Sequence, residues 1–458
     1  MRLKRQKRKS RFITTYIIAG GFLLLIILGT VLLKLPFSSA NGISVPWSDA
    51  LFTATTSVCV TGLVTLPTFS AWSFFGQAVI LVLIQLGGLG LISFTILFLQ
   101  VLGKRIGLRE SQLIQDAYNL DSSNKMDVLV KKIFAGTFII EGIGAVLYCF
   151  IFVPEYGVPG IWKSIFNAVS AFCNAGMDIL GPSSLIPYQT NLAVNLITVI
   201  LIVLGGIGFP VWFYAVDRIR QLKRKETSPK RIWISMPLYI KTVLFMTISL
   251  IFVGALLIFA FEFNNAETLG PLSLSDKVLA SLFQSVTTRT AGFCTVSQSG
   301  LRRSTIIICC VLMFIGGSPS GTAGGIKTTT FLIITASMFS AVSGRDNTEL
   351  FKRKINADAV RKAMSVFSLN FLVMIVSLLL FCIAQQGSFE SCLYEVVSAI
   401  GTVGLSRDLP AQLNLAGKLI IVVTMYLGRI GPISLALFFN TKKYVNLIEL
   451  PEENVPIG

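Results

Sequence analysis

Four short stretches of the chain end in a glycine that is followed by a hydrophobic residue, and each begins as a helix-compatible run containing serine or threonine. The stretches end in VCVTG, FCNAG, TRTAG and IGTVG. Their terminal glycines, Gly62, Gly176, Gly292 and Gly404, are separated by 114, 116 and 112 residues. Four copies at nearly constant spacing indicate four repeats of one structural unit.

The glycines indicate which chemistry these stretches could perform. Glycine adopts positive φ without a Cβ clash, so an irregular segment ending in glycine can turn its carbonyl oxygens toward an axis. Four such segments can replace the hydration shell of a monovalent cation, as in a potassium filter. The side chains differ among the segments, which is expected where the backbone coordinates the ion. The expected filter residues are Val58, Cys59, Val60, Thr61, Gly62, Phe172, Cys173, Asn174, Ala175, Gly176, Thr288, Arg289, Thr290, Ala291, Gly292, Ile400, Gly401, Thr402, Val403 and Gly404.

Long apolar blocks flank each of these stretches and must position them. Blocks such as 13–33, 78–102, 192–216 and 365–384 are long enough to cross a bilayer as helices. The half-polar stretches are too short to span, and irregular backbone at membrane depth must be buried in protein or line a water-filled cavity. We therefore expect an all-α polytopic membrane protein. It would have eight transmembrane helices and four re-entrant pore helices, in four pseudo-symmetric span–pore-loop–span repeats around one central pore.

The basic segments of the chain mark the borders of the repeats. The expected parts are a basic cytoplasmic N-terminal tail (1–11), repeat 1 (12–102), repeat 2 with its preceding cytoplasmic loop (103–216), repeat 3 with its preceding loop (217–342), repeat 4 with its preceding loop (343–440) and a cytoplasmic C-terminal tail (441–458). The expected spans are 12–35, 75–102, 131–153, 193–216, 239–262, 304–342, 364–386 and 416–440.

The net charge is +17, but the distribution of the basic residues argues against nucleic-acid binding. The segments 1–11, 103–132, 217–241, 343–362 and 441–458 hold seven, six, eight, six and two of the 39 lysines and arginines. The intervening segments 36–47, 63–71 and 177–192 hold none. This is the positive-inside asymmetry, and it predicts a multi-pass protein with both termini in the cytoplasm. The same basic face would suit the head groups of anionic membrane lipids.

The composition also argues against an enzyme. The chain has eight cysteines without CxxC spacing and no histidine, so it carries no metal-site pattern. A membrane-embedded enzyme would need a cluster of nucleophilic, acid–base or metal-binding groups, and Glu141 is the main carboxylate within the apolar blocks. We expect no covalent cofactor.

Two arginines lie in segments expected at membrane depth. Arg429 is in the middle of the last apolar span, where an arginine costs about 2.5–3.5 kcal/mol to insert and needs a partner or an aqueous cavity. Arg289 lies inside the third filter segment, where a guanidinium pointing into the pore would oppose cations. We expect its side chain to turn away from the axis and pair with Glu395 or Asp276.

The apolar span expected at 304–342 is interrupted by GGSPSGTAGGIKTTT (316–330). This segment resembles a phosphate-binding P-loop only superficially, because Walker A requires glycine directly before the lysine and Ile326 intervenes here. Among the four second spans we expect only this one to be interrupted in this way, by a movable gate beneath the filter that Arg429 anchors. The expected gating residues are Gly316, Gly317, Ser318, Ser320, Gly321, Thr322, Gly324, Gly325, Lys327 and Arg429.

Taken together, these motifs resemble the Trk/Ktr/HKT superfamily of potassium transporters, above all the membrane subunit of bacterial Ktr systems. The resemblance rests on the filter segments and on QLGGLG (85–90), LGGIGF (204–209), the 316–330 segment and MYLGRIGP (425–432). It implies potassium uptake through a pore in the bacterial plasma membrane, with glycine at all four filter positions favouring potassium. It also implies a homodimer, a cytoplasmic nucleotide-binding regulatory ring of the Ktr type, and sodium as a candidate activator.

Two other functions stay open at this point. A sodium-coupled secondary transporter of another solute would also have broken helices, but with inverted or paired repeats rather than four parallel copies. A less selective monovalent cation channel would use the same filter, since no segment has the TVGYG sequence of potassium channels.

Overall fold

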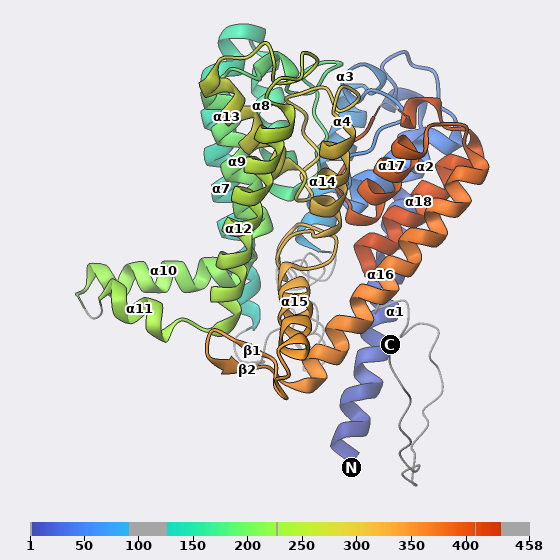
Figure 1. Cartoon of the computed structure of the whole chain (residues 1–458). Helices are drawn as coiled ribbons and strands as arrows, with labels where there is room; N and C mark the ends of the chain where they lie inside the picture. The colour runs from blue at the N-terminus through green and yellow to red at the C-terminus, as the bar shows by residue number, and fades with distance from the viewer. Residues whose placement is uncertain (1, 91–125, 226–227, 408, 432–458) are drawn as a thin grey trace.

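The computed structural model describes residues 2–90, 126–225, 228–407 and 409–431 (Figure 1). The expected parts that fall in 91–125 and 432–458, among them the C-terminal tail, lie outside the described residues. The regular structure of the described chain is almost all helical, with a two-stranded antiparallel sheet of β1 (Glu349–Leu350) and β2 (Arg353–Lys354). The α-helices are α1 (Arg2–Lys34), α2 (Trp47–Cys59), α3 (Thr68–Ala71), α4 (Phe74–Leu89), α7 (Met126–Tyr156), α8 (Pro159–Cys173), α9 (Leu192–Gly206), α10 (Phe209–Lys223), α11 (Pro229–Ser235), α12 (Leu238–Glu262), α13 (Leu274–Thr287), α14 (Arg303–Phe314), α15 (Thr328–Val342), α16 (Ala357–Ala384), α17 (Phe389–Gly401) and α18 (Leu415–Ile430). Short 3-10 turns are η1 (Pro36–Ser38), η2 (Ile186–Tyr188) and η3 (Pro410–Gln412).

The helices form four triplets in which a short helix lies between two others along the chain. The triplets are α1–α2–α4, α7–α8–α9, α12–α13–α14 and α16–α17–α18. The third helix of each triplet packs against the short helix of the next one: α4 on α8, α9 on α13, α14 on α17 and α18 on α2. The last of these contacts joins the fourth triplet to the first, so the four triplets close into a ring.

Three of the described helices have the length and composition of membrane helices. The segments Val130–Tyr156, Leu238–Glu262 and Ala357–Ala384 are each long and apolar enough to cross a bilayer, and α4, α14, α15 and the Ile18–Lys34 part of α1 are shorter apolar helices. Large apolar side chains are exposed on their outer faces, for example Phe150 at 76% and Ile383 at 84%. Soluble monomers rarely expose extensive apolar surface, so this surface is consistent with contact with lipid.

The second span of repeat 2, expected as one helix over 193–216, is broken in the structure, which corrects the expectation of a continuous span there. Helices α9 and α10 meet at 102°. The cause is Gly208, whose φ of 93° and ψ of 139° are not helical. Figure 1 shows α10 and α11 projecting sideways from the end of the molecule where the N-terminus lies. Helices α4 and α18 end at equivalent glycines, Gly90 (φ 82°, ψ 131°) and Gly431 (φ 85°, ψ 138°).

The interruption expected in the second span of repeat 3 is present, with one boundary shifted. Helix α14 ends at Phe314 and α15 begins at Thr328, so residues 315–327 form the irregular segment, hereafter the intramembrane loop. The expected segment 316–330 therefore ended three residues too late, since Thr328–Thr330 are the first turn of α15. Thr328 can begin the helix because its N–H, which has no partner within α15, donates to the Gly317 carbonyl at 3.1 Å.

Glycines let three of the third helices, α4, α9 and α18, approach the last turn of their short helix. A Cβ added to Gly87 of α4 would lie far inside van der Waals contact with the Val58 carbonyl oxygen. The same holds for Gly205 of α9 against the Phe172 oxygen, and for Gly428 of α18 with the oxygen of Ile400. These contacts explain why α4, α9 and α18 share a glycine at this position.

Replacing Gly87 with alanine should destabilise the protein, because the new Cβ would collide with the Val58 backbone, which cannot move aside as a flexible side chain would. Overpacking of this kind costs about 1–3 kcal/mol. Gly142 of α7 is the matched control, since its added Cβ would have no neighbour within 4 Å and alanine favours the helix. Thermal unfolding in detergent measures both; equal midpoints for Gly87→Ala and Gly142→Ala would contradict the packing argument.

Candidate functional site

Three of the four short helices end in the same backbone conformation. The residue after the helix is left-handed in each case: Val60 (φ 54°), Asn174 (φ 60°) and Thr402 (φ 50°). The next N–H then reaches back to the carbonyl five residues earlier, from Thr61 to Thr56 at 2.8 Å, from Ala175 to Ser170 at 2.8 Å and from Val403 to Ser398 at 2.9 Å. This is the hydrogen bonding of a left-handed helix cap, and it turns the chain away from the helix axis.

The third copy reaches a similar conformation by a different route. Helix α13 ends at Thr287, five residues before Gly292, whereas the other three short helices end three residues before their glycine. The positive φ appears at Thr290 (69°), two residues before the glycine as in the other copies. The conformation that the filter segments share is therefore anchored at the glycine rather than at the helix end.

The four glycines lie next to one another in a closed ring. Their φ values are all positive, 98° for Gly62, 64° for Gly176, 84° for Gly292 and 96° for Gly404. A Cβ added to any of them would lie 2.5 Å or less from a carbonyl oxygen of the next segment: Ala175 for Gly62, Ala291 for Gly176, Val403 for Gly292 and Thr61 for Gly404. The contacts run from each segment to the next and return to the first. Both the conformation and the space at these positions therefore require glycine.

Hydroxyl groups on the short helices hold the filter backbone, a role that the sequence analysis did not assign. Thr56 Oγ1 accepts from the Gly62 N–H at 2.9 Å, and Ser398 Oγ accepts from the Gly404 N–H at 3.0 Å. Ser170 Oγ accepts from the N–H after the second glycine, and Thr287 Oγ1 donates to the carbonyl after the third. The serine and threonine in the four stretches were the available signal, because a hydroxyl six residues before the glycine recurs in three copies.

Arg289 does not pair with Glu395 or Asp276, which corrects that expectation. Its Nη1 donates to the Thr247 carbonyl of α12 at 3.5 Å, and the residue is 7% exposed. Asp276 accepts from a serine in the N-terminal cap of its own helix, α13. Glu395 lies on α17 of the next repeat, where it accepts from the Arg407 N–H at 2.8 Å. The guanidinium thus reaches a carbonyl of its own repeat, because both carboxylates are engaged elsewhere.

The intramembrane loop is held against the end of α9 by its backbone and against the second filter segment by one side chain. The N–H groups of Ser318 and Thr322 donate to the carbonyls of Gly206 and Gly205 at 3.0 and 3.1 Å. The Thr322 hydroxyl donates to the Phe172 carbonyl, which belongs to the second filter segment, at 3.1 Å. These bonds connect the third repeat to the second directly beside the ring.

Small residues also bring the loop against the fourth filter segment. A Cβ added to Gly324 would clash with the Thr402 hydroxyl, and Gly325 has a φ of 66°. Lys327 Nζ donates to the Ala323 carbonyl at 2.6 Å, within the loop itself. Gly316, Gly317 and Ser318 are buried, while Ser320 and Gly321 are partly exposed.

Arg429 joins the loop to the first repeat. Its Nη1 donates to the Thr322 carbonyl at 2.5 Å and its Nη2 to the Gly87 carbonyl at 2.6 Å. In the repeats this position is held by glycine three times, at Gly88, Gly206 and Gly317. The arginine therefore places one long cationic side chain where the other repeats have none, and the structure brings it into contact with the predicted gating segment.

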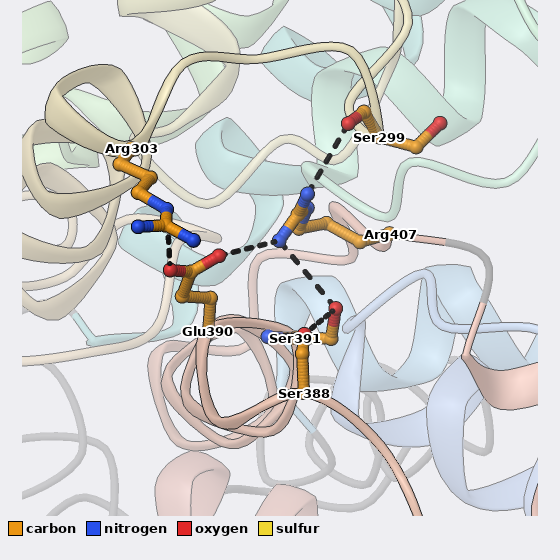
Figure 2. Close-up of polar contacts among 6 residues, drawn as sticks. All are labelled: Ser299, Arg303, Ser388, Glu390, Ser391 and Arg407. Carbon is orange, nitrogen blue, oxygen red and sulfur yellow. Dashed lines mark hydrogen bonds and ion pairs between the residues drawn. The ribbon is translucent and has the colours of Figure 1, made fainter.

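Beyond the fourth glycine, Arg407 connects the fourth repeat to the third (Figure 2). Its guanidinium donates to the Ser391 hydroxyl at 3.4 Å and the Ser299 carbonyl at 3.2 Å, and lies 4.0 Å from Glu390. Glu390 also pairs with Arg303 at 2.9 Å, but the Arg303 side chain is 86% exposed, so that pair contributes little. Among the residues that the structure describes, no cluster of cysteine and carboxylate side chains could hold a metal ion.

Comparison with known proteins identifies the family to which this chain is similar. The family model described as "TrkH: Cation transport protein" matches residues 3–446. The chain is 39% identical over 449 residues to the Ktr system potassium uptake protein B of Bacillus subtilis, covering 98% of this chain and 97% of that protein. It is 35% identical over 467 residues to the potassium/sodium uptake protein NtpJ of Enterococcus hirae, covering 100% of both.

The fold has also been seen in a crystal structure. The potassium transporter TrkH from Vibrio parahaemolyticus superposes with a TM-score of 0.67 at 20% sequence identity, over 92% of this chain and 85% of that one. At this identity the likeness shows the fold alone.

Replacing Thr56 with valine should destabilise the first filter segment, because the buried Gly62 N–H loses the acceptor that lies 2.9 Å away. An unsatisfied buried N–H costs about 1–3 kcal/mol. Thr55 is the control: it is equally buried, but its hydroxyl donates only to the Leu51 carbonyl of its own helix. Thermal unfolding should show a larger loss for Thr56→Val than for Thr55→Val, and the reverse order would refute this role of the hydroxyl.

Proposed function

The chain belongs to the TrkH family of cation transport proteins, and from this premise we propose that it takes up potassium ions across the plasma membrane through a channel-like pore. The observation that carries the proposal is the closed ring of Gly62, Gly176, Gly292 and Gly404. Family members are transporters and not enzymes. At the ring, the four segments lie so close together that only backbone atoms fit between them. Potassium is the substrate and would move down its electrochemical gradient.

The backbone would do the work of coordination in this proposal. Carbonyl oxygens of the four filter segments would replace the hydration shell of the ion. Helices α2, α8, α13 and α17 end where these segments begin, so the partial negative charge of their C-terminal ends would favour a cation there. Since the glycines have no side chains, selectivity would depend on how firmly the surrounding contacts hold the backbone.

Selectivity over sodium is the finer part of the proposal. Glycine at all four positions favours potassium, and the relative in Bacillus subtilis is named a potassium uptake protein. The relative in Enterococcus hirae is named a potassium/sodium uptake protein, which supports a less selective monovalent cation channel as the second candidate. We propose potassium as the main substrate, with sodium as an activator.

The proposed arrangement in the membrane follows the four helix triplets. It comprises eight transmembrane helices and four re-entrant pore helices around one pore, supported by the closure of α18 on α2. The basic segments favour cytoplasmic termini and contact with anionic lipids on the inner face. We further propose a homodimer controlled by a separate cytoplasmic nucleotide-binding ring, as relatives named for a Ktr system suggest.

The intramembrane loop, 315–327, is proposed as the gate. It lies against the second and fourth filter segments, through Thr322 and Gly324, and Arg429 holds it from the opposite side. In this conformation the loop would obstruct the passage beneath the filter. Opening would require the bonds from Arg429 to Thr322 and from Thr322 to Phe172 to break.

Complementation of a bacterium that lacks potassium uptake tests the function. The wild-type chain should restore growth at low potassium and take up rubidium. Gly62→Ser should fold less well or lose selectivity and admit more sodium, because a side chain at φ 98° collides with the Ala175 carbonyl. Absence of rescue by folded wild-type protein would refute potassium uptake. Unchanged rubidium and sodium uptake after substitution of each of the four glycines would refute the filter.

Shortening the loop within Gly316–Gly325 should raise the flux of ions, because the segment that obstructs the passage becomes too short to reach Arg429. Shortening the exposed segment 343–347, which follows α15, is the control and should leave flux unchanged. Uptake of rubidium into liposomes, normalised to folded protein, is the measurement. Unchanged or lost flux in a folded, loop-shortened protein would contradict the assignment of the gate.

A further inference from the structure

A carboxyl group is buried behind the second filter segment, and nothing in the proposed ion path uses it. Glu141 is 4% exposed and lies within Val130–Tyr156, the part of α7 that is apolar enough to cross a membrane. An ionisable group at this depth is costly in either protonation state unless it has hydrogen-bonding partners. The residues that contact Glu141 therefore indicate what this buried carboxyl group does.

The partners of Glu141 come from two other elements around the filter. The Gln85 amide nitrogen on α4 donates to both carboxyl oxygens, at 3.1 and 3.0 Å. The Cys173 thiol lies 3.8 Å from Glu141 Oε1 and 3.6 Å from Gln85 Oε1. Cys173 is the last residue of α8, three residues before Gly176. The cluster therefore connects α7 and α4 to the start of the second filter segment.

The same cluster is close to the anchor of the gate. Gln85 lies two residues before Gly87, whose carbonyl accepts from Arg429. A Cβ added to the next residue, Gly88, would lie 2.7 Å from the Cys173 sulfur, so α4 and the filter segment are in direct contact here. A shift of α4 at Gln85 would consequently move both the filter backbone and the carbonyl that holds Arg429.

The corresponding contacts differ in the other repeats. Three residues before the glycine stand Cys59, Cys173, Arg289 and Gly401 in repeats 1 to 4. At the position of Gln85 the other third helices have Val203, Phe314 and Tyr426. An amide side chain at this position of the third helix is thus particular to the first repeat, and its carboxyl partner, Glu141, lies on the first helix of the second repeat.

We propose that Glu141 is a positioning residue for ion selection, which acts through Gln85 and Cys173 to fix the second filter segment against α4. This inference rests on the proposed function, since it assigns a residue to the ion filter. Because coordination relies on the backbone alone, loosening one of four segments lets the ring adapt to a smaller ion. Loss of the Glu141 contacts should therefore lower the preference for potassium over sodium without abolishing transport.

The test compares uptake of rubidium and sodium into liposomes for the full-length chain and its variants. Glu141→Leu should lower the rubidium-to-sodium ratio about tenfold, the size expected for one lost buried hydrogen bond. Glu141→Gln, which keeps the shape and one acceptor, should lower it less. The reciprocal double variant Glu141→Gln with Gln85→Glu rebuilds the amide–carboxyl pair and should restore most of the ratio.

Glu262 provides the matched control. It is also a fully buried carboxylate at the end of a long helix, but its partners are Asn265, Thr268 and the Arg302 N–H, all outside the filter segments and the loop. Glu262→Gln should lower the unfolding midpoint and leave the ion ratio unchanged. A matching change in the ratio would mean that any buried carboxyl produces it, and the proposal for Glu141 would be wrong.

The outcomes separate this inference from the function on which it rests. If folded wild-type protein carries no potassium or rubidium, the proposed function fails. If the wild type is selective and Glu141→Leu is equally selective, the function stands and the inference is overturned. Should Glu141→Leu not fold, Gln85→Leu removes the hydrogen bonds between Gln85 and Glu141 from the other side, and an unchanged ratio in that variant overturns the inference as well.

Discussion

The close approach of backbone to backbone at the four ring glycines is the constraint on which the rest of the structure depends. Each glycine faces a carbonyl of the next segment at a separation that excludes even a methyl group. Such an approach is possible only if every segment leaves its short helix in the same direction. The left-handed residues Val60, Asn174 and Thr402, and the hydroxyls that accept filter N–H groups, provide that direction.

A second layer of glycines supports the first. The third helices of the triplets can touch the filter backbone only where a side chain is missing, as Gly87, Gly205 and Gly428 show. Because the third helices and the filter segments are closely packed, they cannot move independently of one another. The filter is therefore built into the helix ring, and its geometry is set by packing and by backbone hydrogen bonds rather than by coordinating side chains.

Beneath this nearly symmetric ring the four repeats diverge. The third repeat has the intramembrane loop, the second bends by 102° after α9, and the fourth has Arg429 where the other three have glycine. A site that coordinates a single ion is best built from four equivalent segments. A gate needs one segment that differs from the other three. The divergence is concentrated at the intramembrane loop and the residues that contact it, which fits the proposed gate there.

The repeat spacing, the glycines and the loop with its anchor Arg429 were predictable from the sequence, because each leaves a local signal: a fixed interval, a residue that alone tolerates positive φ, or a charge in an apolar block. The partner of Arg289, the bend at Gly208 and the roles of Glu141, Gln85 and Thr56 were not. The contacts of Arg289 with Thr247 and of Glu141 with Gln85 join residues 42 and 56 positions apart. The Thr56 hydroxyl reaches the Gly62 N–H only once the chain turns at Val60, and the bend depends on whether Gly208 ends the helix. Only the packed ring decides those contacts. The local sequence specifies the backbone conformation, but it does not specify which residue of another element will pack against a given side chain.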